Sequence, residues 1–107
     1  MKRATIEILH EGEILNELKE YIDGTYDQHY AAGKIQSTEF IIDAGHGEGF
    51  AIGNIIKYAQ RYGKKGGFEK NDLLKVVHYA IIALSIHENR FPNRTINYEE
   101  SDNRNTS

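Results

Sequence analysis

The segment from residue 71 to about residue 88 constrains the fold most, because it predicts a helix that is apolar on nearly every side. Asn71 is a suitable N-cap residue for this helix. A helix without a broad polar face is either central to its domain or partly covered by another subunit. A chain of 107 residues buries only about two-thirds of its unfolded surface, so association stabilises it. We therefore expect a homo-oligomer.

Three more helices are expected before this segment, and the apolar residues of the first fall at helical spacing. Gly24 and Gly63 are expected to end the first and the third, because glycine readily takes the left-handed conformation that follows a helix. The predicted helices cover residues 13–22, 36–44 and 50–62. The predicted connections are a loop over residues 25–34 and two glycine-rich turns over residues 45–49 and 64–68.

The two ends of the chain leave alternatives open. Residues 4–9 alternate weakly between apolar and polar, which predicts either a short strand or the start of the first helix. Residues 89–107 are polar and predict either a disordered tail or an arm that packs on a neighbouring subunit. The fold class is therefore mainly α. We expect one small four-helix domain over residues 1–88, with a possible short N-terminal strand.

The composition of the chain indicates its cellular compartment and the classes of partner it can bind. The chain has no cysteine, which excludes disulfides and thiolate metal sites and favours a cytoplasmic protein. No signal-peptide pattern or membrane-spanning apolar run is visible, so no membrane partner is expected. The net charge is −6 over residues 1–56, +4 over residues 57–75 and −1 over residues 76–107. One basic segment in an acidic chain disfavours nucleic acid and favours a small anionic ligand.

The basic segment around the end of the third helix is the predicted binding site. Asn54, Lys57 and Arg61 are spaced to share one helix face, and Lys64 and Lys65 extend it past the helix end. Arginine can hold two phosphate oxygens at once, lysine supplies a point charge, and a glycine turn can present backbone N–H groups. The segment therefore predicts a site for a nucleotide or a similarly phosphorylated small molecule.

Gly53 is assigned to the same site. A glycine inside a helix costs about 1 kcal/mol relative to alanine, and it usually marks close approach by a ligand or another backbone. The alternative for the basic segment is structural, because lysines in the last turn of a helix also complement its dipole. The segment is not a Walker A loop, since it lacks the required Gly-Lys-Ser/Thr.

Other titratable residues are candidates for a site: His29, Tyr30, Glu39, Asp43, His46 and Glu48. His78 lies in the apolar helix and is expected to be a core histidine. No two histidines have the His-x-x-x-His spacing of a helical metal site. The pairs Glu17 with Glu20 and Glu69 with Asp72 are similar to the carboxylate sets of all-α nucleotide pyrophosphohydrolases, which hold magnesium. Magnesium is therefore possible, although no convincing metal site is predicted.

Four motifs occur in order between residues 27 and 82. They are His29-Tyr30-x-x-Gly33-x-Ile35, Glu39-Phe40-Ile41, Phe50-x-x-Gly53-Asn54-x-x-Lys57-Tyr58-x-x-Arg61-x-Gly63-x-Lys65-Gly66 and Asp72-Leu73-x-Lys75-x-x-x-Tyr79. In order and spacing they resemble a small phage family, the SaV-like domain of unknown function, some of whose members are described as nucleotide kinases. The chain lacks the proline that commonly precedes the histidine-tyrosine pair, and it is shorter than those kinases.

The resemblance implies a phage origin and a helical nucleotide-binding domain. It also implies that the ligand contacts come from the shared motifs, and it adds Asp72 and Lys75 to the residues above. The implied ligand-facing residues are His29, Tyr30, Gly53, Asn54, Lys57, Arg61, Lys65, Asp72 and Lys75.

Two functions are expected for such a site. One is a nucleotide kinase acting on a nucleoside monophosphate, with Lys57, Arg61 and Lys65 stabilising charge and His29 as the candidate catalytic acid or base. The other is a non-catalytic sponge that sequesters a nucleotide or cyclic nucleotide messenger of anti-phage defence in the cytoplasm of an infected bacterium. A third hypothesis is an interaction domain whose basic face meets an acidic partner protein or nucleic acid, although the acidity of the whole chain disfavours nucleic acid. No cofactor beyond the nucleotide ligand is predicted.

Overall fold

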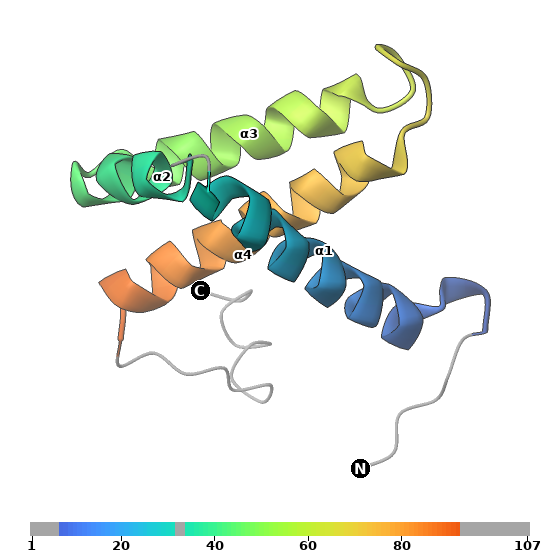
Figure 1. Ribbon diagram of the computed structural model, residues 1–107, viewed down its shortest axis with the longest axis horizontal. Helices are drawn as coiled ribbons and strands as arrows, with labels where there is room; N and C mark the ends of the chain where they lie inside the picture. Colours follow the sequence, from blue (N-terminus) through green and yellow to red (C-terminus); the bar gives the residue numbers. More distant parts are fainter. Residues whose placement is uncertain (1–6, 32–33, 93–107) are drawn as a thin grey trace, which may run out of the picture.

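The structure is a computed structural model that describes residues 7–31 and 34–92, with side chains described for residues 8–28 and 37–92. Residues 93–107, nearly all of the predicted tail or arm, lie outside this part of the chain. Within it, the predicted mainly α class with four helices is confirmed (Figure 1). The elements are η1 (Glu7–Leu9, a short 3₁₀ helix), α1 (Glu11–Ala31), α2 (Lys34–Asp43), α3 (Gly47–Arg61) and α4 (Lys70–Arg90).

The short N-terminal strand is wrong for residues 7–9, which form η1. Residues 4–6, the rest of the expected strand, lie outside the described part, and the described residues contain no strand. A lone strand would leave its backbone N–H and C=O groups without a neighbouring strand, whereas a 3₁₀ turn pairs some of them locally.

Helix α1 is longer than predicted, so the expected loop over residues 25–34 is wrong for residues 25–31, and Lys34 already begins α2; residues 32–33 lie outside the described part. The helix continues through Gly24 to Ala31, although this glycine costs about 1 kcal/mol relative to alanine. Ring contacts with α4 stabilise this half of α1. The ring centre of His78 lies 6.1 Å from that of Tyr21 and 5.9 Å from that of Tyr26. Tertiary packing on both sides of Gly24 therefore outweighs the local preference of one residue.

The turn between α2 and α3 is also shorter than predicted, because α3 begins at Gly47. Gly47 lies buried where three helices meet. A Cβ atom at this position would be 2.9 Å from Ile42 Cγ1 of α2 and 2.9 Å from Ile86 Cδ1 of α4. At such distances a side chain would force the neighbouring isoleucines to shift, so the glycine permits close packing of the three helices.

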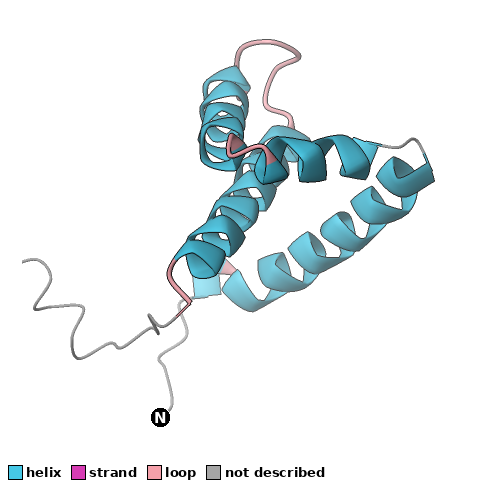
Figure 2. Cartoon of the chain, turned by 90° about the vertical axis from the view of Figure 1, so that its left-hand side faces the viewer, coloured by secondary structure: helices cyan, strands magenta, loops and turns pink. Residues whose placement is uncertain are grey.

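Helices α3 and α4 form a hairpin with the most extensive interhelical contact in the described part of the chain. As predicted, Gly63 follows the end of α3, with a φ of 82° that glycine tolerates best. Figures 1 and 2 show α4 in the middle, with α3 along one side and α1 crossing it on another, while α2 bridges from α1 to the start of α3.

The buried apolar residues among those described are few: Leu18, Ala51 and Leu74. Helix α4 is central, as one of the two alternatives had it, but it is not covered all round. Between 37% and 61% of the surface remains exposed for four of its apolar residues, Leu73, Val77, Ile81 and Leu84. The same helix buries two polar residues, Asp72 and His78, and both lead to the functional site.

Candidate functional site

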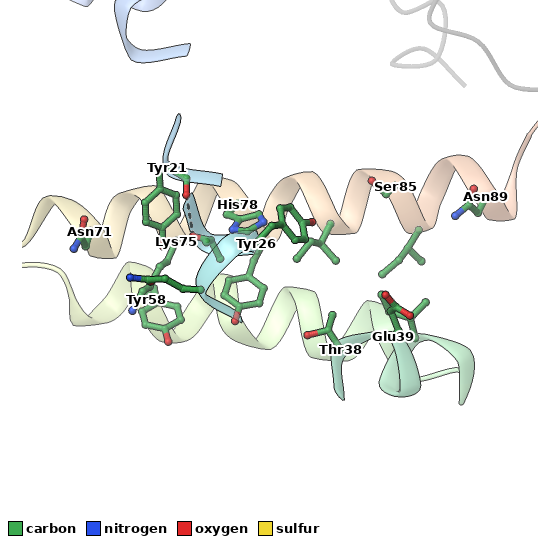
Figure 3. Close-up of a pocket in the computed structure, with 16 residues that line it drawn as sticks. Tyr21, Tyr26, Thr38, Glu39, Tyr58, Asn71, Lys75, His78, Ser85 and Asn89 are labelled. Carbon is green, nitrogen blue, oxygen red and sulfur yellow. Dashed lines mark hydrogen bonds between the residues drawn. The ribbon is translucent and has the colours of Figure 1, made fainter. Parts of the chain in front are cut away.

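A cleft of about 690 Å³ lies between α1, α2 and α4, with one residue of α3 at its edge (Figure 3). Sites for small molecules commonly have volumes of about 300–1,000 Å³. Tyrosines from three helices line this one, and we call it the tyrosine cleft. Its lining residues are Tyr21, Thr25, Tyr26, Gln28, Thr38, Glu39, Ile42, Tyr58, Asn71, Lys75, His78, Tyr79, Ile82, Ser85, Ile86 and Asn89.

One face of α4 forms a long wall of the tyrosine cleft. Its lining residues follow one another at helical spacing, at positions 71, 75, 78, 79, 82, 85, 86 and 89, and residues so spaced share one helix face. At 1.5 Å per residue, the row from Asn71 to Asn89 is about 27 Å long. The cleft is therefore elongated, and its two ends can meet different parts of one ligand.

The two ends differ in charge. Figure 3 shows Lys75 beside Tyr58 at one end, and Glu39 toward the other end, where Ser85 and Asn89 also lie. The first end offers an ammonium group, while the second offers a carboxylate, a hydroxyl and an amide. An anionic group is therefore favoured at the Lys75 end, because the Glu39 carboxylate repels it from the opposite end.

The middle of the cleft is an aromatic cluster around His78. This histidine is 9% exposed, as expected for a core residue, yet it also lines the cleft. Its ring centre is 6.1 Å from Tyr21, 5.9 Å from Tyr26 and 6.2 Å from Tyr79, and the first two contacts are edge-on. Tyr26 keeps 44% of its surface exposed, so its ring is accessible to a flat ligand.

Two phenols of the cleft are perturbed by their surroundings. Burial raises the pKa of Tyr79 above its ordinary value of 10.0, and the phenols of Tyr58 and Tyr21 raise it further. Burial likewise raises the pKa of Tyr21; a hydrogen bond with the Thr25 side chain partly offsets this, and Tyr58 adds to it. Both phenols are therefore neutral near pH 7 and bring no negative charge into the cleft.

Two lysines from different helices approach the ring of Tyr58. The Nζ atom of Lys75 in α4 lies 4.9 Å from the ring centre, and that of Lys57 in α3 lies 5.0 Å from it. Each contact is worth about 0.5–1 kcal/mol at an exposed site. Tyr58 itself stacks on Tyr79, with ring centres 5.9 Å apart. The ring thus gathers two positive charges at one end of the cleft.

Arg61 lies in a different environment from the one its spacing predicted. Its Nε atom is 3.6 Å from Oδ1 of Asp72, whose side chain is 6% exposed, whereas the Arg61 side chain is 38% exposed. Arg61 Nε and Asp72 Oδ2 are both buried without a hydrogen bond. Neither residue lines the tyrosine cleft. The pair instead joins the end of α3 to the start of α4.

Most of the predicted basic face also lies outside the tyrosine cleft. Asn54 donates its Nδ2 hydrogen to the carbonyl oxygen of Phe50, 2.9 Å away. Apart from the backbone of its own helix, a Cβ atom at Gly53 would have no described atom within 4 Å, so no other described segment packs against this position. Lys64 and Lys65 are exposed in the turn between α3 and α4. Of this predicted set, the structure brings Lys57 beside the cleft.

His29 and Tyr30 lie in the last turn of α1, but their side chains are outside the described part of the structure. Their ligand contacts, and the catalytic role of His29, therefore stay predictions. Among the other candidates, Glu39 lines the cleft. Glu48 instead contacts Arg90, with Oε2 and Nη1 3.2 Å apart.

The described residues contain no group of three or more histidine, aspartate or glutamate side chains placed to hold a metal ion. Each predicted carboxylate pair has one member in contact with a cation, since Glu17 contacts Lys70 and Asp72 contacts Arg61. In the same part of the chain, no helix is long and apolar enough to cross a bilayer.

Sequence reasoning did not assign the tyrosines of the cleft to the site, although Tyr58 and Tyr79 occur in the shared motifs and α4 carries a further signal for the cleft. Asn71, Lys75, Ser85 and Asn89 interrupt the apolar pattern of α4 at spacings that place them on one face. A polar row on an otherwise apolar helix indicates a face that meets water or a ligand. The tyrosines themselves come from three helices, so no local pattern connects them.

Comparison with known proteins finds a family match over the middle of the chain, which includes part of the cleft. Residues 25–81 match the family described as "Protein of unknown function (DUF3310)", and this range includes Tyr26, Tyr58, Lys75 and Tyr79. No curated protein and no solved structure matches the chain. Because the family match covers more than half of the 107 residues, the chain belongs to this family of unknown function.

Proposed function

We propose that this protein binds a nucleotide in the tyrosine cleft, with the phosphates at the lysine end and the base toward Glu39. The observation that carries the proposal is the meeting of Lys57 and Lys75 at the ring of Tyr58, with Nζ atoms 5.0 Å and 4.9 Å from its centre. It combines positive charge with aromatic surface at one end of an elongated cleft.

The lysine end suits phosphate. The two ammonium groups come from different helices and lie 5.0 Å and 4.9 Å from the centre of the Tyr58 ring, so an anion bound at this ring is attracted by both. Asn71 lines the cleft one helical turn before Lys75 and supplies amide N–H donors. A charge-assisted hydrogen bond of this kind contributes about 1.5–3 kcal/mol.

The aromatic middle suits a nucleobase. Stacking of a base on an aromatic side chain is worth about 1–3 kcal/mol, and the ring of Tyr26 is 44% exposed. Beyond it, the carboxylate of Glu39 and the amide oxygen of Asn89 can accept hydrogen bonds from ring N–H or exocyclic amino groups. A phosphorylated ligand without a base would leave this half of the cleft unused.

The length of the cleft bears on the activity. The residues that line the cleft extend over about 27 Å along α4, so the cleft is long enough for more than one nucleotide unit. A kinase needs such room for a phosphate donor and a nucleoside monophosphate acceptor. A sponge needs it for a messenger that contains two nucleotides. The resemblance to phage proteins gives both activities a setting, the cytoplasm of an infected bacterium, where sequestering a defence messenger would protect the phage.

The test begins with the purified chain and a mixed pool of nucleoside mono-, di- and triphosphates and cyclic dinucleotides. Mass spectrometry of the solution and of the heat-released ligand is expected to show a bound nucleotide. New di- or triphosphates would establish the kinase, whereas one unchanged nucleotide in near-stoichiometric amount would establish the sponge. If no nucleotide is recovered and none changes, the proposed function is wrong.

A matched pair of variants then locates the site. Lys75→Gln removes a charge inside the cleft, and Lys65→Gln removes the same charge from the exposed turn. Calorimetry with the recovered nucleotide is expected to show affinity lowered about 10- to 100-fold by Lys75→Gln and nearly unchanged by Lys65→Gln. The reverse order would assign the site to the basic turn and exclude the tyrosine cleft.

A further inference from the structure

The outer side of α4 carries exposed apolar residues between two opposite charges. The apolar residues are 44%, 42%, 37% and 61% exposed in chain order, and the Lys70 side chain is 68% exposed. The row consists of Lys70, Leu73, Val77, Ile81, Leu84 and Glu88, and we call it the outer stripe. Successive residues of the stripe are three or four positions apart, so all six share one helix face.

We propose that the outer stripe is the interface of a homodimer in which α4 packs antiparallel against α4 of a second copy. A twofold interface uses the same surface of both copies, so each residue must suit a partner on the same stripe. With the axis near residue 79, Val77 of one copy faces Ile81 of the other. Leu73 faces Leu84 in the same register, to within one residue.

The charges select the antiparallel arrangement. In the register that pairs the apolar residues, Lys70 at the start of each stripe faces Glu88 at the end of the other. A parallel pair would place each charge against its own copy, which is destabilising. Lys70 also contacts Glu17 of α1 in its own chain, but with 68% of its side chain exposed its ammonium group can meet a second carboxylate.

The apolar surface continues from the stripe onto α1. A shallow groove beside Ile81 is lined by Leu15, Leu18 and Ile22 of α1, with Lys19 and Asp23 also at its edge. Leu15 is 65% exposed. A second copy seated on the stripe therefore covers apolar residues of two helices. This matches a chain in which only three apolar residues are buried among those described.

The first test compares two exposed apolar residues of the full-length chain. Leu84 on the stripe and Ile56 on α3 are each 61% exposed, so lysine at either position removes a similar apolar surface. Light scattering over a concentration series is expected to give twice the chain mass of 12.2 kDa for the wild type and for Ile56→Lys. We expect Leu84→Lys to raise the dimer dissociation constant by about a hundredfold or more.

A charge-reversal series tests the register. Glu88→Lys and Lys70→Glu each place like charges together and are expected to weaken the dimer. The double variant restores opposite charges between the copies and is expected to recover the dimer in part, because the glutamate at position 70 then faces Glu17 of its own chain. Far-ultraviolet circular dichroism checks that every variant remains helical. A monomeric wild type overturns the proposal. So does a dimer that Leu84→Lys leaves intact, or one that folded single variants weaken and the double variant does not recover.

Discussion

Replacing Arg61 by methionine is expected to destabilise the fold, because it leaves the buried carboxylate of Asp72 without its cation. The side-chain length is nearly kept, so the change removes mainly charge. Arg61 Nε and Asp72 Oδ1 are 3.6 Å apart, and unit charges at that distance attract by about 4.6 kcal/mol at an effective dielectric constant of about 20. Desolvation of both groups opposes this attraction.

The exposures of the two side chains determine how much free energy of unfolding is lost when the pair is broken. Breaking a fully buried pair costs about 3–5 kcal/mol, whereas an exposed pair contributes about 1 kcal/mol at most. Asp72 is 6% exposed and Arg61 38% exposed, so the pair lies between these limits. We expect Arg61→Met to cost about 2 kcal/mol. Asp72→Asn should cost only about 1 kcal/mol, since a lone Arg61 can still reach water.

Urea unfolding followed by circular dichroism measures both costs, at one protein concentration because self-association would add to stability. The double variant Arg61→Met/Asp72→Asn is expected to be more stable than Arg61→Met alone, because no unpaired charge remains. Equal costs for the two single variants, or costs that simply add in the double variant, would refute the interhelical pair. If Arg61→Met keeps full stability but loses the recovered nucleotide, the guanidinium serves the ligand, as the sequence predicted.

Two further predictions concern packing and pH. Gly47→Ala should lower the free energy of unfolding in urea by about 1–3 kcal/mol, since its Cβ atom would lie 2.9 Å from Ile42 Cγ1. The control is Gly49→Ala in the same helical turn, which meets nothing within 4 Å and should not destabilise. Equal effects of the two variants would contradict the close packing at Gly47. Because the pKa values of Tyr21 and Tyr79 are raised above 10.0 in the folded state, their contribution to stability is complete below pH 10.0 and is lost as the pH rises through the folded values. Unfolding measured across the alkaline range should show this loss, and a Tyr21→Phe/Tyr79→Phe variant with an unchanged pH dependence would exclude these phenols as its source.

Helix bounds were predictable where the chain carries its own end signals. The end of α3 is an example, because Gly63 takes a φ of 82° that other residues rarely adopt. Gly24 gives the same signal in the sequence but lies inside α1. Its surroundings are decided by the contacts of Tyr21 and Tyr26 with His78, more than 50 residues along the chain. A local reading of glycine cannot include such a contact.

The candidate site was predictable only in part for a related reason. The basic character of the segment from residue 57 to residue 75 can be recognised from consecutive residues, and the segment includes Lys57 and Lys75. The contacts of each cation depend on residues from another helix. The path of the turn between α3 and α4 brings Asp72 to Arg61 and Tyr58 to Lys75, so one cation joins two helices and the other meets the cleft.

The sequence of α4 is apolar on nearly every side because several of its faces contact different parts of the structure. One face packs on α3, and a second forms a wall of the tyrosine cleft and contacts α1 through His78. A third face, from Leu73 to Leu84, stays exposed. A helix buried at the centre of a larger domain would have every face covered by its own chain. It would then carry no exposed apolar row with opposite charges at its two ends. The proposed homodimer accounts for the charges Lys70 and Glu88 at the two ends of that face, because an antiparallel second copy of α4 would present the same charges in reversed order.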